Sequence, residues 1–222
     1  ASQLAVSKSL INRFSPPDAN GVARFKLEVS EATASQIVDL MNSDEVTKFD
    51  IKDTSENISQ HLADLLNADS NDKLNYVKTA NKAQLVMDFT DYDKVDTKLL
   101  LAKVNKGAYN IKLTDVSVEN LKELTVPNLT DRLLFVDKSI EAITLKDDGS
   151  AIESNLDLLN AAGNRLKSIE ITNTLDNLLT LSAKDFINRQ TVLNKIEGSY
   201  IADLEKASIK QALSFSTNVN IN

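Results

Sequence analysis

The chain has 222 residues, 42% hydrophobic and 26% charged, which suits a folded protein of one large or two small domains. Its net charge is −7 and no cluster of Lys and Arg supplies a basic surface, so we expect no nucleic-acid partner. Cysteine is absent and His61 is the single histidine, which excludes disulfides and zinc sites built from Cys and His.

The lack of cysteine also bears on location. A cytosolic chain of this length commonly carries a few buried thiols, whereas their absence is typical of bacterial proteins exported in an unfolded state. No apolar run approaches the roughly twenty residues that a membrane-spanning helix requires. We therefore expect an extracellular protein at the cell surface, without a membrane span.

Three glycines, Gly21, Gly107 and Gly198, each precede a similar stretch of sequence. VARFKLEVSEATASQIVDL follows the first, AYNIKLTDVSVENLKEL the second and SYIADLEKASIKQAL the third. The spacings are 107 − 21 = 86 and 198 − 107 = 91 residues. A nearly fixed period predicts stacked units that share a continuous core.

The period predicts four segments. Residues 1–21 end a preceding unit, 22–107 form the first unit, 108–198 form the second, and 199–222 begin another. Because the chain then starts and stops out of phase with its own repeat, we expect it to be a piece of a longer array. The alternative is a complete protein with degenerate capping repeats.

Each unit contains a shorter motif of the form apolar-x-x-apolar-x-apolar-x-polar. It occurs at 46–53, 140–147 and 166–173, with weaker copies at 22–29, 74–81 and 108–115. The alternation of apolar and polar positions predicts strands with one buried and one wet face. The wet face is expected to carry Lys26, Asp50, Lys112, Thr144 and Glu170.

A helix is predicted after most strands. Asp53, Ser150 and Ser182 are each followed three residues later by Glu or Asp, a pattern close to a capping box. Gly163 and Gly198 are placed to end helices in a left-handed conformation. Apolar residues recur at helical spacing, as Ile58, Leu62, Leu65 and Leu66, as Ile152, Leu156 and Leu159, and as Phe186, Leu193 and Ile196.

Alternating strands and helices predict an α/β fold. Parallel strands joined by crossover helices would form a solenoid-like stack of strand-turn-helix repeats with a mainly parallel sheet. The alternative fold class is a set of α+β repeat domains.

Acid-rich segments are the candidates for metal binding. Asp88, Asp91, Asp93 and Asp96 could supply oxygen ligands to Ca²⁺, and 69–72 forms a lesser candidate. Neither segment has the glycine or the terminal Glu of an EF-hand loop, and Asp91 and Asp93 also suit a helix N-terminus. No cofactor is required by the sequence, and Ca²⁺ is the one that it could accommodate.

Catalytic motifs are missing. A Ser-His-Asp arrangement would have to use His61, whose repeat counterpart is Asn155, and no phosphate-binding loop or G-x-S-x-G motif is present. Carboxylate pairs could serve a glycosidase, but any acidic protein offers them. Asp53, Asp115 and Asp147 recur at strand exits, where they could form a ladder of ligands or satisfy turns and caps. Because they recur in phase, we expect the structural role and no enzyme.

The segment at 165–200, RLKSIEITNTLDNLLTLSAKDFINRQTVLNKIEGSY, with DDGSAIESNLDLLNAAG before it, resembles repeats of very large secreted bacterial surface proteins of the S-layer and RTX-type adhesin groups. The resemblance covers 138–200 well and 43–109 less closely. It implies export and a structural or adhesive role, with calcium often bound elsewhere in such proteins. The glycine-rich calcium nonapeptide of the RTX group is absent here.

The sequence therefore predicts a non-catalytic structural or assembly segment of an exported cell-surface protein. Its partners would be neighbouring repeats or copies of the same protein. The alternative is a solenoid recognition module that binds a protein or a cell-surface glycan on its sheet face; such a face should gather aromatic or single-signed residues.

Overall fold

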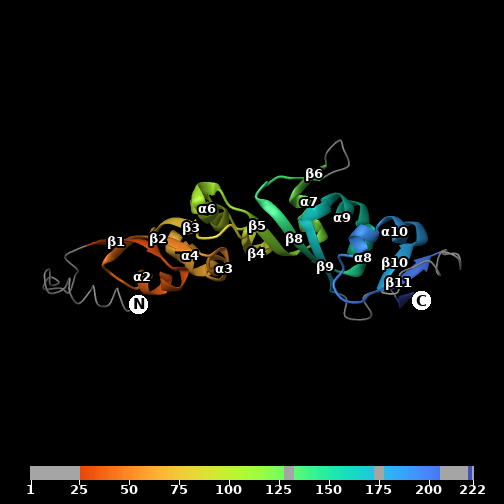
Figure 1. Cartoon of the computed structure of the whole chain (residues 1–222), viewed down its shortest axis with the longest axis horizontal. Coiled ribbons are helices and arrows are strands. Elements are labelled where there is room, and N and C mark those ends of the chain that lie inside the picture. The colour runs from red at the N-terminus through yellow and green to blue at the C-terminus, as the bar shows by residue number, and fades with distance from the viewer. Residues whose placement is uncertain (1–25, 128–132, 173–177, 206–219, 222) are drawn as a thin grey trace. The chain divides into compact units, whose positions relative to one another are not determined.

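The computed structural model describes residues 26–127, 133–172, 178–205 and 220–221. These residues form an α/β structure whose sheets are mostly parallel, as the strand motif predicts (Figure 1). The opening segment 1–21, its Pro16-Pro17 and the motif residue Asn173 lie outside the described residues. Within the described part of the chain, every helix is too short or too polar to cross a membrane.

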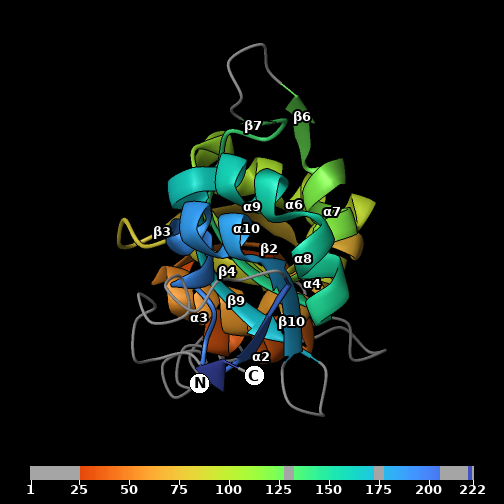
Figure 2. The same cartoon turned by 90° about the vertical axis from the view of Figure 1, so that its right-hand side faces the viewer.

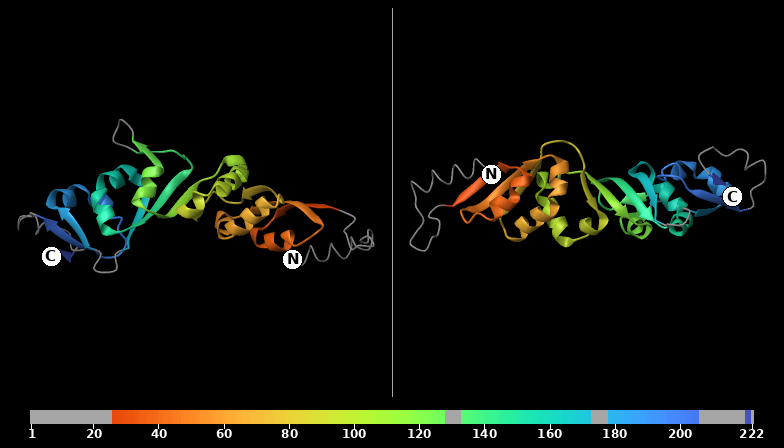
Figure 3. Two further views of the ribbon diagram at one scale, coloured as in Figure 1. Left: turned by 180° about the vertical axis from the view of Figure 1, so that it is seen from behind. Right: turned by 90° about the horizontal axis from the view of Figure 1, so that it is seen from below.

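The chain divides into two compact units, the first made of residues 1–86 and 90–110 and the second of 87–89 and 111–222. This division does not test the repeat boundaries, which stay a prediction. Figure 3 shows the first unit in orange to yellow-green and the second in green to blue.

The elements up to Asn110 begin with β1 (Leu27–Ala32), η1 (Ala34–Gln36), α2 (Ile37–Met41), β2 (Val46–Asp53), α3 (Ser55–Gln60), α4 (Leu62–Ser70) and β3 (Leu74–Thr79). They continue with β4 (Leu85–Asp88), α5 (Phe89–Tyr92), α6 (Val95–Lys103) and η2 (Asn105–Gly107).

The later elements are β5 (Ile111–Val116), α7 (Val118–Glu123), β6 (Thr125–Pro127), β7 (Leu133–Phe135), β8 (Ile140–Asp147), α8 (Gly149–Ser154), α9 (Leu156–Ala162) and η3 (Gly163–Arg165). They end with β9 (Leu166–Ile171), β10 (Leu178–Ser182), α10 (Ala183–Asn188), α11 (Gln190–Leu193), β11 (Ile201–Glu205) and β12 (Asn220–Ile221).

The described strands form three sheets, in the orders β1-β2-β3, β4-β5-β8-β9 and β10-β11-β12, together with the antiparallel hairpin β6-β7. Pairing is parallel throughout β1-β2-β3, β5-β8-β9 and β10-β11-β12. β3 and β9 each gain a single-residue bridge on their far side, from Val104 to Val77 and from Ile196 to Ile169. The chain thus leaves the sheet after β3 or β9 and forms a short strand, β4 or β10, and a helical segment. It then returns to form a bridge beside β3 or β9.

Pairing registers agree between the units. Phe49 pairs with Leu74 in the first unit, and Ile143, 94 residues later, pairs with Leu166 in the second. A bulge interrupts β1 between Val29 and Ala32, and another interrupts β5 between Leu113 and Val116. Each bulge holds one acidic residue at positive φ, Glu31 at 55° and Asp115 at 51°.

The buried side chains follow the predicted spacing. Those of the strand motif and of the helices are almost fully buried, among them Val46, Phe49, Ile51, Ile58, Leu65, Ile140, Ile143, Leu145, Ile152 and Leu159. The five predicted wet-face residues are all exposed or half-buried, as expected for strands with one face in the core.

Two of the three predicted helix caps are wrong. Thr54 rather than Asp53 caps α3, by accepting the N–H of Asn57 at 3.3 Å. Asp148 rather than Ser150 caps α8, and only Ser182 is the predicted cap, for α10. The two errors differ in cause: the Asp53 carboxylate accepts the N–H of Ala34, whereas the Ser150 hydroxyl donates to Asp148.

The helices are also shorter than predicted, because three residues break them. His61 separates α3 from α4, Asn155 separates α8 from α9 and Arg189 separates α10 from α11, each with φ between −106° and −128°. Gly163 ends α9 with φ 59°, as predicted. Gly198 has φ 79° but is not a helix end, because α11 already stops at Leu193.

Candidate functional site

Two of the three strand-exit aspartates bond the helical turn beside them. The Asp53 carboxylate accepts the N–H of Ala34, the first residue of η1, at 3.0 Å and the N–H of Thr54 at 2.8 Å. Asp147 accepts the N–H of Val118, the first residue of α7, at 2.8 Å. These contacts favour the structural role expected for both residues. Each carboxylate accepts an N–H from the first turn of a helix, where the helix itself offers no carbonyl acceptor.

Asn81 serves the same purpose at the exit of β3. Its Oδ1 accepts the N–H of Ser55 at 3.0 Å and the Ser55 hydroxyl at 2.9 Å, and Ser55 is the first residue of α3. A polar residue at the exit of one strand therefore holds the helix that follows the preceding strand. We call this contact the exit bond.

Asp115 takes no part in an exit bond. It lies on the bulge of β5 and pairs with Lys146 of β8 at 3.6 Å. Its positional equivalent is Glu31, which accepts a hydrogen bond from Lys52 of β2 at 2.9 Å. The grouping of Asp115 with Asp53 and Asp147 is therefore wrong, because the bulge shifts it out of the exit position.

Lysines on the wet strand face are paired with carboxylates of neighbouring strands or, for Lys48, of the turn before β3. Lys52 bonds Glu31, Lys48 bonds Asp72 at 2.6 Å, and Lys146 also bonds Glu170 at 3.0 Å. The lysine hydrogen bond and charge hold the pKa of Glu31 below its usual value. This face thus carries both signs in neighbouring positions.

Two of the four predicted metal candidates make ion pairs. Asp91 bonds Lys94 at 2.6 Å and Asp93 bonds Lys98 at 2.7 Å, while Asp96 lies in the first turn of α6. Asp88 ends β4, in a different unit from the other three. Among the described residues no group of three or more acidic or histidine side chains could hold a metal ion. Calcium binding stays a prediction.

In the lesser candidate segment, Asp69 pairs with Lys103 and Asp72 with Lys48.

His61 lies at the break between α3 and α4. Its Nδ1 is 3.0 Å from an Asp64 oxygen one turn later, and Asn155 occupies the matching break. The side chain therefore contributes to a local helix contact.

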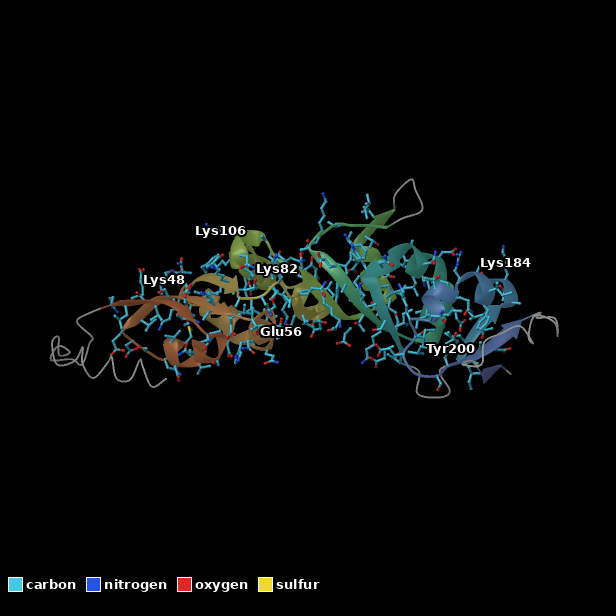
Figure 4. All side chains as sticks on the ribbon, in the orientation of Figure 1. Lys48, Glu56, Lys82, Lys106, Lys184 and Tyr200 are labelled. Atoms are coloured by element: carbon cyan, nitrogen blue, oxygen red, sulfur yellow. The ribbon has the colours of Figure 1, made fainter. Side chains whose placement is uncertain are left out.

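The pocket of interest lies at the carboxyl end of β3, and all of its lining belongs to the first unit. Its volume is about 370 Å³ and it is lined by Thr79, Asn81, Lys82, Ala83, Leu85, Asn105, Ala108, Tyr109 and Asn110. Figure 4 labels Lys82 in this region and Lys106 on the adjoining turn. We call it the β3-exit pocket. The sequence motif includes Asn81, but no sequence signal joins it to Asn105 and Tyr109.

A second hollow, of about 250 Å³, lies beside the β1 bulge and includes Glu28, Lys48, Asp50 and Asn75. Asp50 accepts a hydrogen bond from Asn75 there at 2.9 Å. Lys48 on its wall is already paired with Asp72.

Comparisons with protein-family models, with curated proteins and with solved structures found no match to this chain. The resemblance to secreted surface proteins is therefore carried by the sequence phrases alone.

Proposed function

We propose that this chain is a non-catalytic structural segment of an exported bacterial cell-surface protein, a building block of a lattice or stalk. In this proposal its strand-turn-helix units stack as a solenoid with copies of themselves or with neighbouring repeats. The observation that carries it is the exit bond. Asp53 and Asp147 hold equivalent amides in two units, which is how a repeated scaffold and not a reactive group would use a carboxylate.

The paired wet face supports the same proposal over recognition along the sheet. A ligand-binding face gathers aromatic or single-signed residues. Here Lys52 and Lys146 pair with carboxylates of neighbouring strands, and Lys48 pairs with Asp72 of the turn before β3. A surface whose positive and negative groups pair with one another favours solubility and the stacking of like units.

Sedimentation velocity over a range of protein concentrations, with and without Ca²⁺, tests the proposal. We expect ordered self-association, in which the sedimentation coefficient rises with concentration. A monomer at every concentration that is indifferent to calcium would contradict it. So would full stability of residues 108–198 alone, because a stacked unit needs its neighbour to bury apolar surface, at about 25 cal/mol per Å².

A further inference from the structure

The β3-exit pocket arises where the chain changes sheets. After Thr79 the chain does not continue into a neighbouring strand of the same sheet, since β4 pairs in the sheet of β5 and β3 is bridged by Val104 instead. In open α/β sheets, ligands bind in crevices outside the carboxyl ends of the strands, and this pocket lies at the carboxyl end of β3. A volume of about 370 Å³ is at the small end for ligand pockets and suits one ring-sized molecule.

Its charge is unlike that of the rest of the molecule. The chain carries a net charge of −7, yet none of the nine lining residues is acidic. Within the described residues, the Lys82 ammonium has neither an ion pair nor a hydrogen bond, whereas Lys48, Lys52 and Lys146 are paired. An uncommitted ammonium favours an anionic ligand here, because no carboxylate of the lining itself pairs with it.

Two amide side chains are held in place around this lysine. Asn105 accepts the N–H of Thr79 at 3.1 Å and donates to its hydroxyl at 2.6 Å. Asn81 is fixed by Ser55 and donates to Glu56 at 2.9 Å. Each amide group has two N–H donors, so each keeps one beyond these bonds.

These pre-positioned donors, with Tyr109 and Asn110 beside them, suit the hydroxyl groups of a polar ring.

The rim of the pocket carries backbone strain that the scaffold does not require. Asn105, Lys106 and Gly107 all have positive φ, at 46°, 57° and 82°. The corresponding turn before β11 has positive φ only at Gly198. Left-handed conformation in a residue such as Lys costs about 1 kcal/mol or more and clusters at ligand sites. The strained turn places Asn105 against Thr79, on the pocket wall.

We propose that the β3-exit pocket binds a single acidic sugar, a pyranose ring that carries a carboxylate. Lys82 pairs with the carboxylate, and Asn81, Asn105, Asn110 and Tyr109 contact the ring and its hydroxyls. A phosphate group fits less well, because the lining offers one cation and no arginine fork. The site is independent of self-association.

Titration of the 222-residue protein with D-glucuronate, followed by amide chemical shifts, tests the site. We expect saturable shifts at residues 79–85 and 105–110. D-glucose, which lacks the carboxylate, and acetate, which lacks the ring and its hydroxyls, should each bind about tenfold more weakly than glucuronate. Lys82→Gln should weaken glucuronate binding by about the same factor. Lys184→Gln, which removes an exposed charge on α10 and is labelled in Figure 4, should leave binding unchanged.

Three results would overturn the proposal: no shift at these amides, acetate binding as tightly as glucuronate, or Lys82→Gln binding like the parent protein. Equal binding of acetate would mean a bare carboxylate site. Each result leaves the assembly proposal standing, because sedimentation measures that separately.

Discussion

Asp53 and Asp147 lie 94 residues apart and bond the same two backbone positions of their units. Each accepts the first amide of the helical turn that follows the preceding strand, at 3.0 and 2.8 Å, and the amide of the next residue, at 2.8 and 2.9 Å. Strands next to each other are thereby tied at their exits as well as along their ladders. The exit bond explains why acids recur in phase.

Loss of the exit bond should destabilise the protein. Asp53→Ala and Asp147→Ala each leave two amides without their acceptor, so we expect a loss of about 1–3 kcal/mol in the free energy of unfolding. Asp50→Ala is the matched control, because Asp50 lies on the wet face and bonds only the Asn75 side chain. Urea unfolding measures all three, and an equal effect at Asp50 would argue against a special role for the exit position.

Stability should fall on acidification, and Asp53 should contribute to the fall. Burial pushes the pKa of Asp53 up, but hydrogen bonds from Asn57, Ala34 and Thr54 outweigh it and hold the pKa below its ordinary value. A lowered folded-state pKa gives stability that is present above the unfolded pKa of about 3.9 and lost as the pH drops through the folded value.

Melting temperatures between roughly pH 6 and pH 2 should therefore decline less steeply in Asp53→Asn than in the parent protein. An identical decline in the two would show that this carboxylate does not couple folding to pH.

The long strands and the buried helix faces could be predicted because their signal is local. Phe49, Ile51 and Leu65 alternate at strand or helix spacing, and all are nearly fully buried. The caps could not be assigned as readily, since Asp53 and Thr54 are adjacent and both accept backbone amides. Thr54 caps α3 because the Asp53 carboxylate is taken up by Ala34, at the start of the helical turn after β1. That long-range contact is not visible in the local sequence.

Elements without a repeated signal were missed. β4 and β10 are short, at four and five residues, and the hairpin β6-β7 has no counterpart among the described residues of the first unit. Figure 2 shows this hairpin beyond α7. It lengthens the interval between strand starts from 46 − 27 = 19 residues to 140 − 111 = 29. The pocket was missed because its lining residues are brought together only by the change of sheet after Thr79.

The revised cap assignment makes a direct test at α8. Asp148→Ala removes the acceptor of the Ala151 amide, bonded at 2.8 Å, and should cost about 1 kcal/mol. Ser150→Ala should cost less than about 0.5 kcal/mol, because its hydroxyl only donates to the exposed Asp148 carboxylate. Thermal unfolding of the two variants decides between them; a larger loss at Ser150 would restore the original assignment.

A glycine at the pocket rim should relieve the backbone strain there and stabilise the protein. Lys106→Gly places a residue without a Cβ at φ 57°. It removes about 1–2 kcal/mol of strain, and the unfolded-state freedom of glycine offsets about 0.4–1 kcal/mol of this, so we expect the free energy of unfolding to rise by about 0.5 kcal/mol. Ala108→Gly, two residues away at φ −99°, should instead lower it by about 0.4–1 kcal/mol, because glycine gains unfolded-state freedom there. Loss of stability in Lys106→Gly would show that the left-handed turn carries no strain.

The matching registers allow a deletion in phase with the repeat. Removal of residues 49–142 joins Lys48 to Ile143 and leaves a hybrid strand whose inward positions are Val46, Ile143 and Leu145. Its partners on either side keep their pairing, because β2 and β8 carry the same bulged register with β1 and β5 and the same register with β3 and β9.

We expect this shorter chain to fold, with an α/β circular dichroism spectrum and a cooperative urea transition. Removal of 49–141 retains Ala142 and shifts the strand by one position, so that either Val46 or the pair of Ile143 and Leu145 faces water. That variant should have a clearly lower urea midpoint. Equal midpoints, or failure of the in-phase chain alone, would mean that the two units do not share an interchangeable scaffold.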